Sequence, residues 1–147
     1  MTPPSSLNPS MSPADKWNVP QYVLIVDDDR VFGQTICAAL KADGFPAVAV
    51  STVVAALELV RKVRPAVILL DLVMPGIDGE HFLGILKSEL GTAAIPLIII
   101  SGKMNDESAR ELTALGADAT VSKSKTTLAE IRRLVKQHLG LPKTSAA

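Results

Sequence analysis

The sequence predicts an α/β protein in which a parallel five-stranded sheet lies between layers of helices. Five short apolar runs occur between residues 22 and 122, and a stretch with helical spacing follows each run. The apolar residues of each run are consecutive, which is typical of strands that are buried on both faces of a parallel sheet. Because crossovers between parallel strands are right-handed, the five βα units place helices on both faces of the sheet.

The predicted strands are short and consist mainly of β-branched and aliphatic residues, which favour extended structure. Turn residues separate them from the helical stretches. The five strands are Tyr22–Val26, Ala47–Val50, Ala66–Leu70, Pro96–Ile100 and Ala119–Ser122.

Apolar residues spaced three or four apart predict one helix after each strand. Glycines in the position of a helix end, or a proline just beyond it, mark where the helices stop. The apolar stripes are Phe32–Leu40, Ala56–Val63, Phe82–Leu86, Ala109–Leu115 and Leu128–Leu139, and the stop signals are Gly44, Pro65, Gly91, Gly116 and Gly140.

Length and composition predict one globular domain. The chain has 147 residues, of which 48% are hydrophobic and 20% are charged, and its formal net charge is zero. This composition excludes a wholly disordered chain, and the charge balance gives no support to binding nucleic acid or an anionic membrane. The single cysteine, Cys37, cannot form an internal disulfide and is expected to be buried and inert.

The two ends of the chain are expected to lie outside the domain. Five of the ten prolines occur in the first 20 residues together with several serines, so we expect residues 1–20 to form a flexible tail. The domain is expected at residues 21–141, with a second flexible tail at 142–147. A secretory signal and an apolar run long enough to cross a membrane are both missing, which predicts a cytoplasmic protein.

Polar residues follow four of the predicted strands. Asp27, Asp28 and Asp29 come after the first strand, Asp71 after the third, Ser101 after the fourth and Lys123 after the fifth. Taken singly, such residues are commonly helix caps, turn residues or solvated side chains. The carboxyl ends of parallel strands meet at one edge of the sheet, which is where ligands bind in such folds. The six residues together therefore predict a site.

The residue types at this edge indicate phosphoryl chemistry. Neighbouring carboxylates repel one another, so the cluster favours a bound cation, and oxygen ligands without His or Cys suit Mg²⁺. A carboxylate such as Asp71 can attack phosphorus only when the negative charges are offset, which the metal and Lys123 would do. The hydroxyl of Ser101 could donate a hydrogen bond to a phosphoryl oxygen.

The chain resembles the receiver domains of response regulators, the chemotaxis-type phosphoacceptor modules. The resemblance rests on four motifs in order, which together cover roughly Tyr22 to Leu141. They are Val26-Asp27-Asp28-Asp29, Leu70-Asp71-Leu-Val-Met-Pro-Gly-Ile-Asp-Gly79, Ile100-Ser101-Gly102 and Val121-Ser122-Lys123. The resemblance implies a flavodoxin-like fold with strand order 2-1-3-4-5.

The resemblance also implies the role of each site residue. Asp71 would be phosphorylated, with a phosphohistidine of a sensor histidine kinase or a histidine phosphotransfer protein as donor. Asp28 and Asp71 would bind Mg²⁺ directly, Asp27 would bind it directly or through water, and the backbone carbonyl of Val73 would complete the protein ligands. Ser101 and Lys123 would contact the phosphoryl group.

Several positions depart from the family pattern. Ser124 follows Lys123 where the family usually has proline, so we expect a trans peptide bond there. Thr120 stands where many members have an aromatic ring that rotates on activation, so a ring switch is unavailable. The resemblance implies that Val73 and Lys103 occupy positions that tune the lifetime of the phosphoryl group, and an apolar Val73 cannot orient an attacking water. The alternative is that both are loop residues without a kinetic effect.

The sequence thus predicts a single-domain response regulator that is not an enzyme. Its output is expected through a downstream protein effector and not through DNA, by way of the fourth helix, fifth strand and fifth helix, as a monomer or a phosphorylation-dependent dimer. The alternatives are a degenerate receiver that binds its partner without phosphorylation and a Mg²⁺-dependent aspartyl phosphohydrolase. Asp29 is expected to cap a helix or lie at the surface. The basic pair Arg132 and Arg133 is expected to form a solvated helix face, with contact to an acidic partner as the alternative.

Overall fold

A parallel sheet of five strands forms the centre of the molecule, as the sequence predicts. The computed structural model describes residues 22–72, 79–89, 92–102 and 104–139. The strands lie in the order β2-β1-β3-β4-β5, which confirms the predicted topology. They are β1 (Val23–Val26), β2 (Ala47–Val50), β3 (Val67–Asp71), β4 (Leu97–Ser101) and β5 (Ala119–Ser122).

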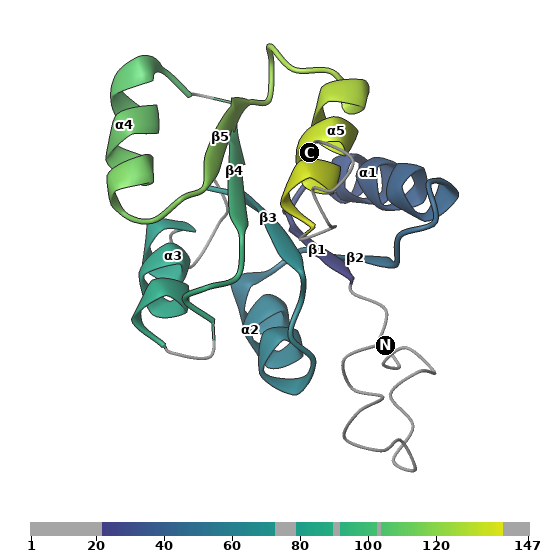
Figure 1. The fold of residues 1–147 in the computed structure, drawn as a ribbon, viewed down its shortest axis with the longest axis horizontal. Helices are drawn as coiled ribbons and strands as arrows, with labels where there is room; N and C mark the ends of the chain where they lie inside the picture. The colour runs from purple at the N-terminus through teal and green to yellow at the C-terminus, as the bar shows by residue number, and fades with distance from the viewer. Residues whose placement is uncertain (1–21, 73–78, 90–91, 103, 140–147) are drawn as a thin grey trace, which may run out of the picture.

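One helix follows each strand, and the helices cover both faces of the sheet. In Figure 1, α1 and α5 lie on one side of the strands, and α2, α3 and α4 lie on the other. The helices are α1 (Arg30–Ala42), α2 (Val53–Lys62), α3 (Gly79–Ser88), α4 (Asp106–Ala114) and α5 (Leu128–His138). Among the described helices, none has both the length and the apolar character that a membrane crossing requires.

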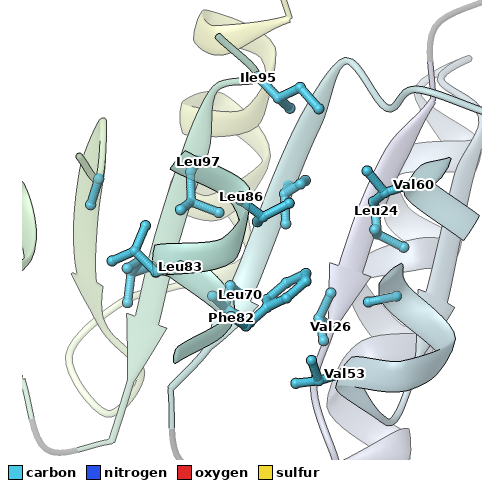
Figure 2. Packing of buried hydrophobic residues seen from close by; sticks show 14 of the residues in the cluster. Leu24, Val26, Val53, Val60, Leu70, Phe82, Leu83, Leu86, Ile95 and Leu97 are labelled. Atoms are coloured by element: carbon cyan, nitrogen blue, oxygen red, sulfur yellow. The ribbon is translucent and has the colours of Figure 1, made fainter. Parts of the chain in front are cut away.

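Alternation along the strands divides the core into two layers. Leu24 and Val26 of β1 face α2 and α3, while Val23 and Ile25 face α1 and α5, because successive side chains of a strand point to opposite faces. Figure 2 shows the first layer, in which Phe82 of α3 lies among strand residues and is fully buried. Both faces of the sheet are therefore covered by apolar side chains, which explains the continuous apolar runs in the sequence.

Local signals begin and end the helices close to the predicted positions. Asp29, Thr52, Asn105 and Thr127 are N-caps, and each side chain accepts a hydrogen bond from a backbone N–H of the first turn. Asp29 therefore has the capping role that the sequence predicts. Gly44 and Gly116 follow the ends of α1 and α4 with φ of 91° and 117°, a conformation that favours glycine.

Two side-chain hydroxyls bind carbonyls at the end of α3. The helix ends at Ser88, and its predicted stop signal, Gly91, lies outside the described residues. The Thr92 hydroxyl donates to the carbonyl of Leu86 at 2.5 Å, and the Ser88 hydroxyl donates to the carbonyl of Ile85 at 2.9 Å. These hydroxyls satisfy carbonyls that a further helical turn would otherwise use, as the end of a helix requires.

Several predictions concern residues outside the described ranges. These are the tails at 1–20 and 142–147, the ligand carbonyl of Val73 and the phosphoryl-lifetime position Lys103.

Candidate functional site

The carboxyl ends of four strands bring the predicted site residues to one edge of the sheet. Asp27 directly follows β1, Asp71 and Ser101 are the last residues of β3 and β4, and Lys123 directly follows β5. The register aligns the ends, since Asp71 pairs with Ile100 and Ser101 pairs with Ser122. The backbone N–H of Lys123 then donates to the carbonyl of Ser101 at 2.8 Å, which extends the β4–β5 pairing by one residue.

Three carboxylates come together at this edge. Asp27, Asp28 and Asp71 each offer one oxygen, and these oxygens lie within 4.8 Å of one another. Asp27 and Asp71 are buried, at 3% and 4% exposure, whereas Asp28 is exposed. We call Asp27, Asp28 and Asp71 the acidic cluster. Oxygen-only ligands at this spacing fit a hard divalent cation such as Mg²⁺, which binds through carboxylates while retaining water on its open side.

The carboxylate of Asp27 is held at both of its oxygens. Its Oδ1 accepts a hydrogen bond from the backbone N–H of Asp29 at 2.9 Å, and its Oδ2 accepts one from Nζ of Lys123 at 2.9 Å. A charged hydrogen bond compensates for the burial of a carboxylate. Asp27 is therefore oriented by its own loop and by a residue 96 positions further along the chain.

The ammonium group of Lys123 lies between acidic side chains and an aromatic ring. Its Nζ is 2.9 Å from Asp27, 3.7 Å from Asp71 and 4.2 Å from the centroid of the Phe32 ring. Burial alone lowers the pKa of Lys123, but the hydrogen bond to Asp27 and the nearby charges of Asp27, Asp71 and Asp29 raise it above its ordinary value. Lys123 is thus a cation that is hydrogen-bonded to Asp27 and lies within 3.7 Å of the carboxylate of Asp71.

Ser101 places a hydroxyl at the same edge. It is the last residue of β4, next to β3 and Asp71, and it is only 5% exposed. The structure therefore brings Asp27, Asp28, Asp71, Ser101 and Lys123 to one place, as the strand-end prediction requires.

Two departures from the family pattern can be examined in the structure. The described residues contain no cis peptide bond, so the bond between Lys123 and Ser124 is trans, as expected. Thr120 pairs with Ile99 in the β4–β5 ladder and is half-buried. It lines a cavity of about 260 Å³ between β5 and α5.

The side chain of Arg132 is 36% exposed on a partly solvated helix face, but it also forms an ion pair that the sequence did not reveal. Its guanidinium binds both oxygens of Asp43, the C-cap residue of α1, and its Nε donates to Oδ2 at 2.8 Å. Nζ of Lys136 lies 3.1 Å from the same carboxylate. Arg133, in contrast, is exposed as expected. We call Asp43, Arg132 and Lys136 the Asp43 cluster.

Sequence reasoning also missed Phe32, which it assigned only to the apolar stripe of α1. The ring is half-buried against the core layer below α1 and α5, and its face lies under the ammonium of Lys123. The two residues are 91 positions apart, so no local pattern could reveal the contact.

Comparison with known proteins gives the family. The model of the response regulator receiver domain matches residues 23–136. This protein belongs to the receiver domain family. Receiver domains act in two-component signalling. The matched range contains every residue of the acidic cluster, as well as Ser101 and Lys123.

Curated relatives match this receiver domain over part of their length. The DNA-binding response regulator MtrA of Mycobacterium tuberculosis (strain ATCC 25618 / H37Rv) is 31% identical over 83 residues, which is 56% of this chain and 35% of MtrA. A protein-glutamate methylesterase/protein-glutamine glutaminase of Myxococcus xanthus is 36% identical over 117 residues, which is 78% of this chain and 33% of that protein. The match thus spans about a third of these relatives.

Solved structures show the same fold. The receiver domain of Francisella response regulator 1452 is 27% identical with a TM-score of 0.74, and the alignment covers 81% of this chain and 96% of that one. The chemotaxis protein CheY4 of Vibrio cholerae also has a TM-score of 0.74, at 22% identity over 80% of this chain and 98% of its own. The second likeness is one of fold alone.

Proposed function

We propose that this receiver domain is a Mg²⁺-dependent phosphoacceptor in which Asp71 is the phosphorylated residue. One observation supports the proposal above all others: three carboxylates, a buried hydroxyl and an ammonium gather at the carboxyl ends of four strands. The donor would be a phosphohistidine on a sensor histidine kinase or a histidine phosphotransfer protein.

The transfer is a displacement at phosphorus. A carboxylate oxygen of Asp71 attacks the phosphorus atom and forms a new P–O bond. The P–N bond to the donor histidine breaks, and the imidazole nitrogen leaves with the bonding electron pair and takes up a proton from water. The product is an acyl phosphate on Asp71 and a neutral histidine on the donor, so atoms and charge balance.

The acidic cluster would hold the metal. Asp28 and Asp71 would be direct ligands, Asp27 would bind directly or through water, and the carbonyl of Val73 would complete the protein ligands. When bound, Mg²⁺ would offset the negative charge that the acidic cluster and the incoming phosphoryl group bring together.

Ser101 and Lys123 would bind the phosphoryl group after transfer. The Nζ of Lys123 is already 3.7 Å from Asp71, so a small movement away from Asp27 would bring it to a phosphoryl oxygen. The Ser101 hydroxyl, on the neighbouring strand, would donate to a second oxygen. The added negative charge of ~1.5 to 2 units would shift the conformational equilibrium of the loop after β4 and of the surface beyond it. This shift would be the signal.

The output surface would be the face formed by α4, β5 and α5, which would bind a protein effector. Leu115 at the end of α4 and Leu128 at the start of α5 are exposed large apolar residues, at 54% and 38% exposure. Hydrogen exchange measured before and after phosphorylation tests this assignment. We expect changed protection in α4, β5 and α5; protection of the same residues by duplex DNA would instead favour output to nucleic acid.

Intact-protein mass spectrometry tests the phosphoacceptor role directly. The protein is incubated with a small-molecule phosphodonor with and without Mg²⁺. We expect one phosphoryl adduct that requires Mg²⁺, that is absent from Asp71→Asn and that is retained in the control Glu58→Gln at an exposed position of α2. An adduct that survives Asp71→Asn would contradict the proposal, and continued release of phosphate over many turnovers would favour an aspartyl phosphohydrolase.

A further inference from the structure

The ring of Phe32 and the loop before α1 form a closed chain of contacts with Lys123. The backbone N–H of Asp29 donates to Asp27 at 2.9 Å, and the Asp29 carboxylate accepts from the N–H of Phe32 at 3.0 Å. The Phe32 ring lies 4.2 Å from Nζ of Lys123, which donates back to Asp27 at 2.9 Å. The cap that begins α1 therefore also fixes the backbone that carries the ring.

The geometry at Phe32 is that of a cation–π interaction. An ammonium within about 6 Å of a ring centroid is attracted by the negative face of the ring, and more strongly where water is partly excluded. Nζ of Lys123 lies well inside that distance, and the Lys123 side chain is only 22% exposed. The ring thus attracts the ammonium independently of the carboxylate oxygens.

This attraction to the ring matters because Lys123 and a divalent cation would contact the same carboxylates. Lys123 contacts Asp27 and Asp71, and both belong to the acidic cluster that fits a divalent cation. Two cations at one group of oxygens repel each other strongly where water is partly excluded. The ring face attracts the ammonium at the place where it also donates to Asp27, so the ring still holds it beside Asp71 once a metal draws on the carboxylate oxygens.

We propose that Phe32 is a positioning residue for phosphorylation, whose ring holds the Lys123 ammonium beside Asp71 when the carboxylates are occupied. The proposal rests on the phosphoacceptor role assigned to Asp71. It also gives a second function to Asp29, whose carboxylate caps the helix turn that carries the ring.

Nuclear magnetic resonance tests the contact without any measurement of activity. Protons held over the face of an aromatic ring resonate upfield of their usual position. We expect an upfield shift of the ε-methylene protons of Lys123 in the metal-free protein, retention of the shift when Mg²⁺ is added, and its loss in Phe32→Leu. A normal position in the wild-type protein, or loss of the shift on adding Mg²⁺, would overturn the proposal.

Fluorination separates the charge distribution of the ring from its size. Pentafluorophenylalanine at position 32 keeps the shape of the ring but removes the negative face that attracts a cation. We expect phosphorylation of Asp71 by a small-molecule phosphodonor to slow roughly threefold to tenfold, as the loss of one partly buried cation–π contact implies. Phe32→Tyr retains the negative face and should keep a rate near that of the wild type.

Phe45 provides the matched control. It is also a half-buried phenylalanine that packs against the core layer below α1 and α5. Pentafluorophenylalanine at position 45 should leave the rate unchanged, and thermal melting should show that both fluorinated proteins fold. Equal rates in the wild-type protein and in the protein fluorinated at position 32 would overturn the role of Phe32 alone. Absence of a Mg²⁺-dependent adduct in the wild-type protein would overturn the phosphoacceptor role and, with it, that of Phe32.

Discussion

The helix α1 connects two charge clusters of opposite character. At its start lies the acidic cluster of Asp27, Asp28 and Asp71, in which Asp27 and Asp71 contact the ammonium of Lys123. At its end lies the Asp43 cluster, in which one carboxylate receives Arg132 and Lys136. Counting these named groups alone, the first cluster has an excess of negative charge and the second an excess of positive charge.

The two clusters illustrate how a site differs from a structural ion pair. In the Asp43 cluster the carboxylate is fully compensated, and it joins the end of α1 to α5, which packs beside it. In the acidic cluster the three negative charges exceed the single positive charge of the lysine. The carboxylates therefore repel one another, and a bound cation would relieve this repulsion. We interpret uncompensated charge at the strand ends as functional and compensated charge at the opposite end as structural.

The largest expected effect on stability is that of Lys123→Met in the metal-free protein. The substitution removes the ammonium and leaves the carboxylate of Asp27, which is almost fully buried, without its cationic partner. Loss of one partner of a buried ion pair should lower the free energy of unfolding by about 3 kcal/mol. Urea denaturation measures this, and saturating Mg²⁺ should restore part of the loss. An unchanged unfolding midpoint would show that Lys123 does not compensate Asp27.

Asp28→Asn should weaken Mg²⁺ binding by roughly tenfold to a hundredfold, because one of three carboxylates loses its charge near a divalent ion. Isothermal titration calorimetry measures the change, and Glu58→Gln on α2 is the control. Affinity equal to that of the wild type would exclude Asp28 as a ligand.

The same Asp28→Asn protein distinguishes the two clusters by the sign of its stability change. Without metal, the exposed Asp28 contributes repulsion to the acidic cluster, so its neutralisation should raise the melting temperature slightly. A fall in melting temperature without metal would show that the acidic cluster is stabilised in some other way.

Asp43→Asn should have the opposite effect and lower the melting temperature by a few degrees. The substitution removes the charge that attracts Arg132 and Lys136 and weakens the connection between α1 and α5. Thermal unfolding followed by circular dichroism measures the loss, and Glu58→Gln, at an exposed position of α2, is the control. Phosphorylation of Asp71 should proceed at the wild-type rate, since the Asp43 cluster lies at the far end of α1.

The smallest expected effect is the pH dependence of that stabilisation. Hydrogen bonds from Arg132 and Lys136 lower the pKa of Asp43 from its usual 3.8 to about 2. Because the folded pKa lies below the unfolded one, the stabilisation is complete above pH 3.8 and is lost as the pH falls towards 2. The stability difference between wild type and Asp43→Asn should be constant from pH 5 to 7 and shrink below pH 4. A difference that stayed constant down to pH 2 would contradict the assigned ion pairs.

Local patterns in the sequence predicted the fold and the strand-end site well. The apolar runs gave the strands to within one residue, because burial on both faces demands consecutive apolar side chains. The rule that parallel strands present their carboxyl ends together placed Asp27, Asp71, Ser101 and Lys123 in one site. The ligand role of Asp28 came from the resemblance to receiver domains, and its exposure could not be read from the pattern.

Contacts between distant parts of the chain escaped prediction. Arg132 and Asp43 are 89 positions apart, and each alone resembles an ordinary surface charge. Phe32 fitted the apolar stripe of α1, and only the position of β5 brings Lys123 over its ring. These pairings depend on the three-dimensional placement of α1 against α5 and β5, which periodicity does not specify.

The central claim is that the excess of negative charge at the strand ends serves transfer of a phosphoryl group to Asp71. Borohydride reduces an aspartyl phosphate to homoserine, so reduction after treatment with phosphodonor and Mg²⁺, followed by peptide mass spectrometry, marks the modified residue. We predict homoserine at position 71 in the sample with Mg²⁺ and aspartate there in the sample without it. Homoserine at position 27 or 28, or an unmodified position 71 in a protein that had gained a phosphoryl group, would contradict the account.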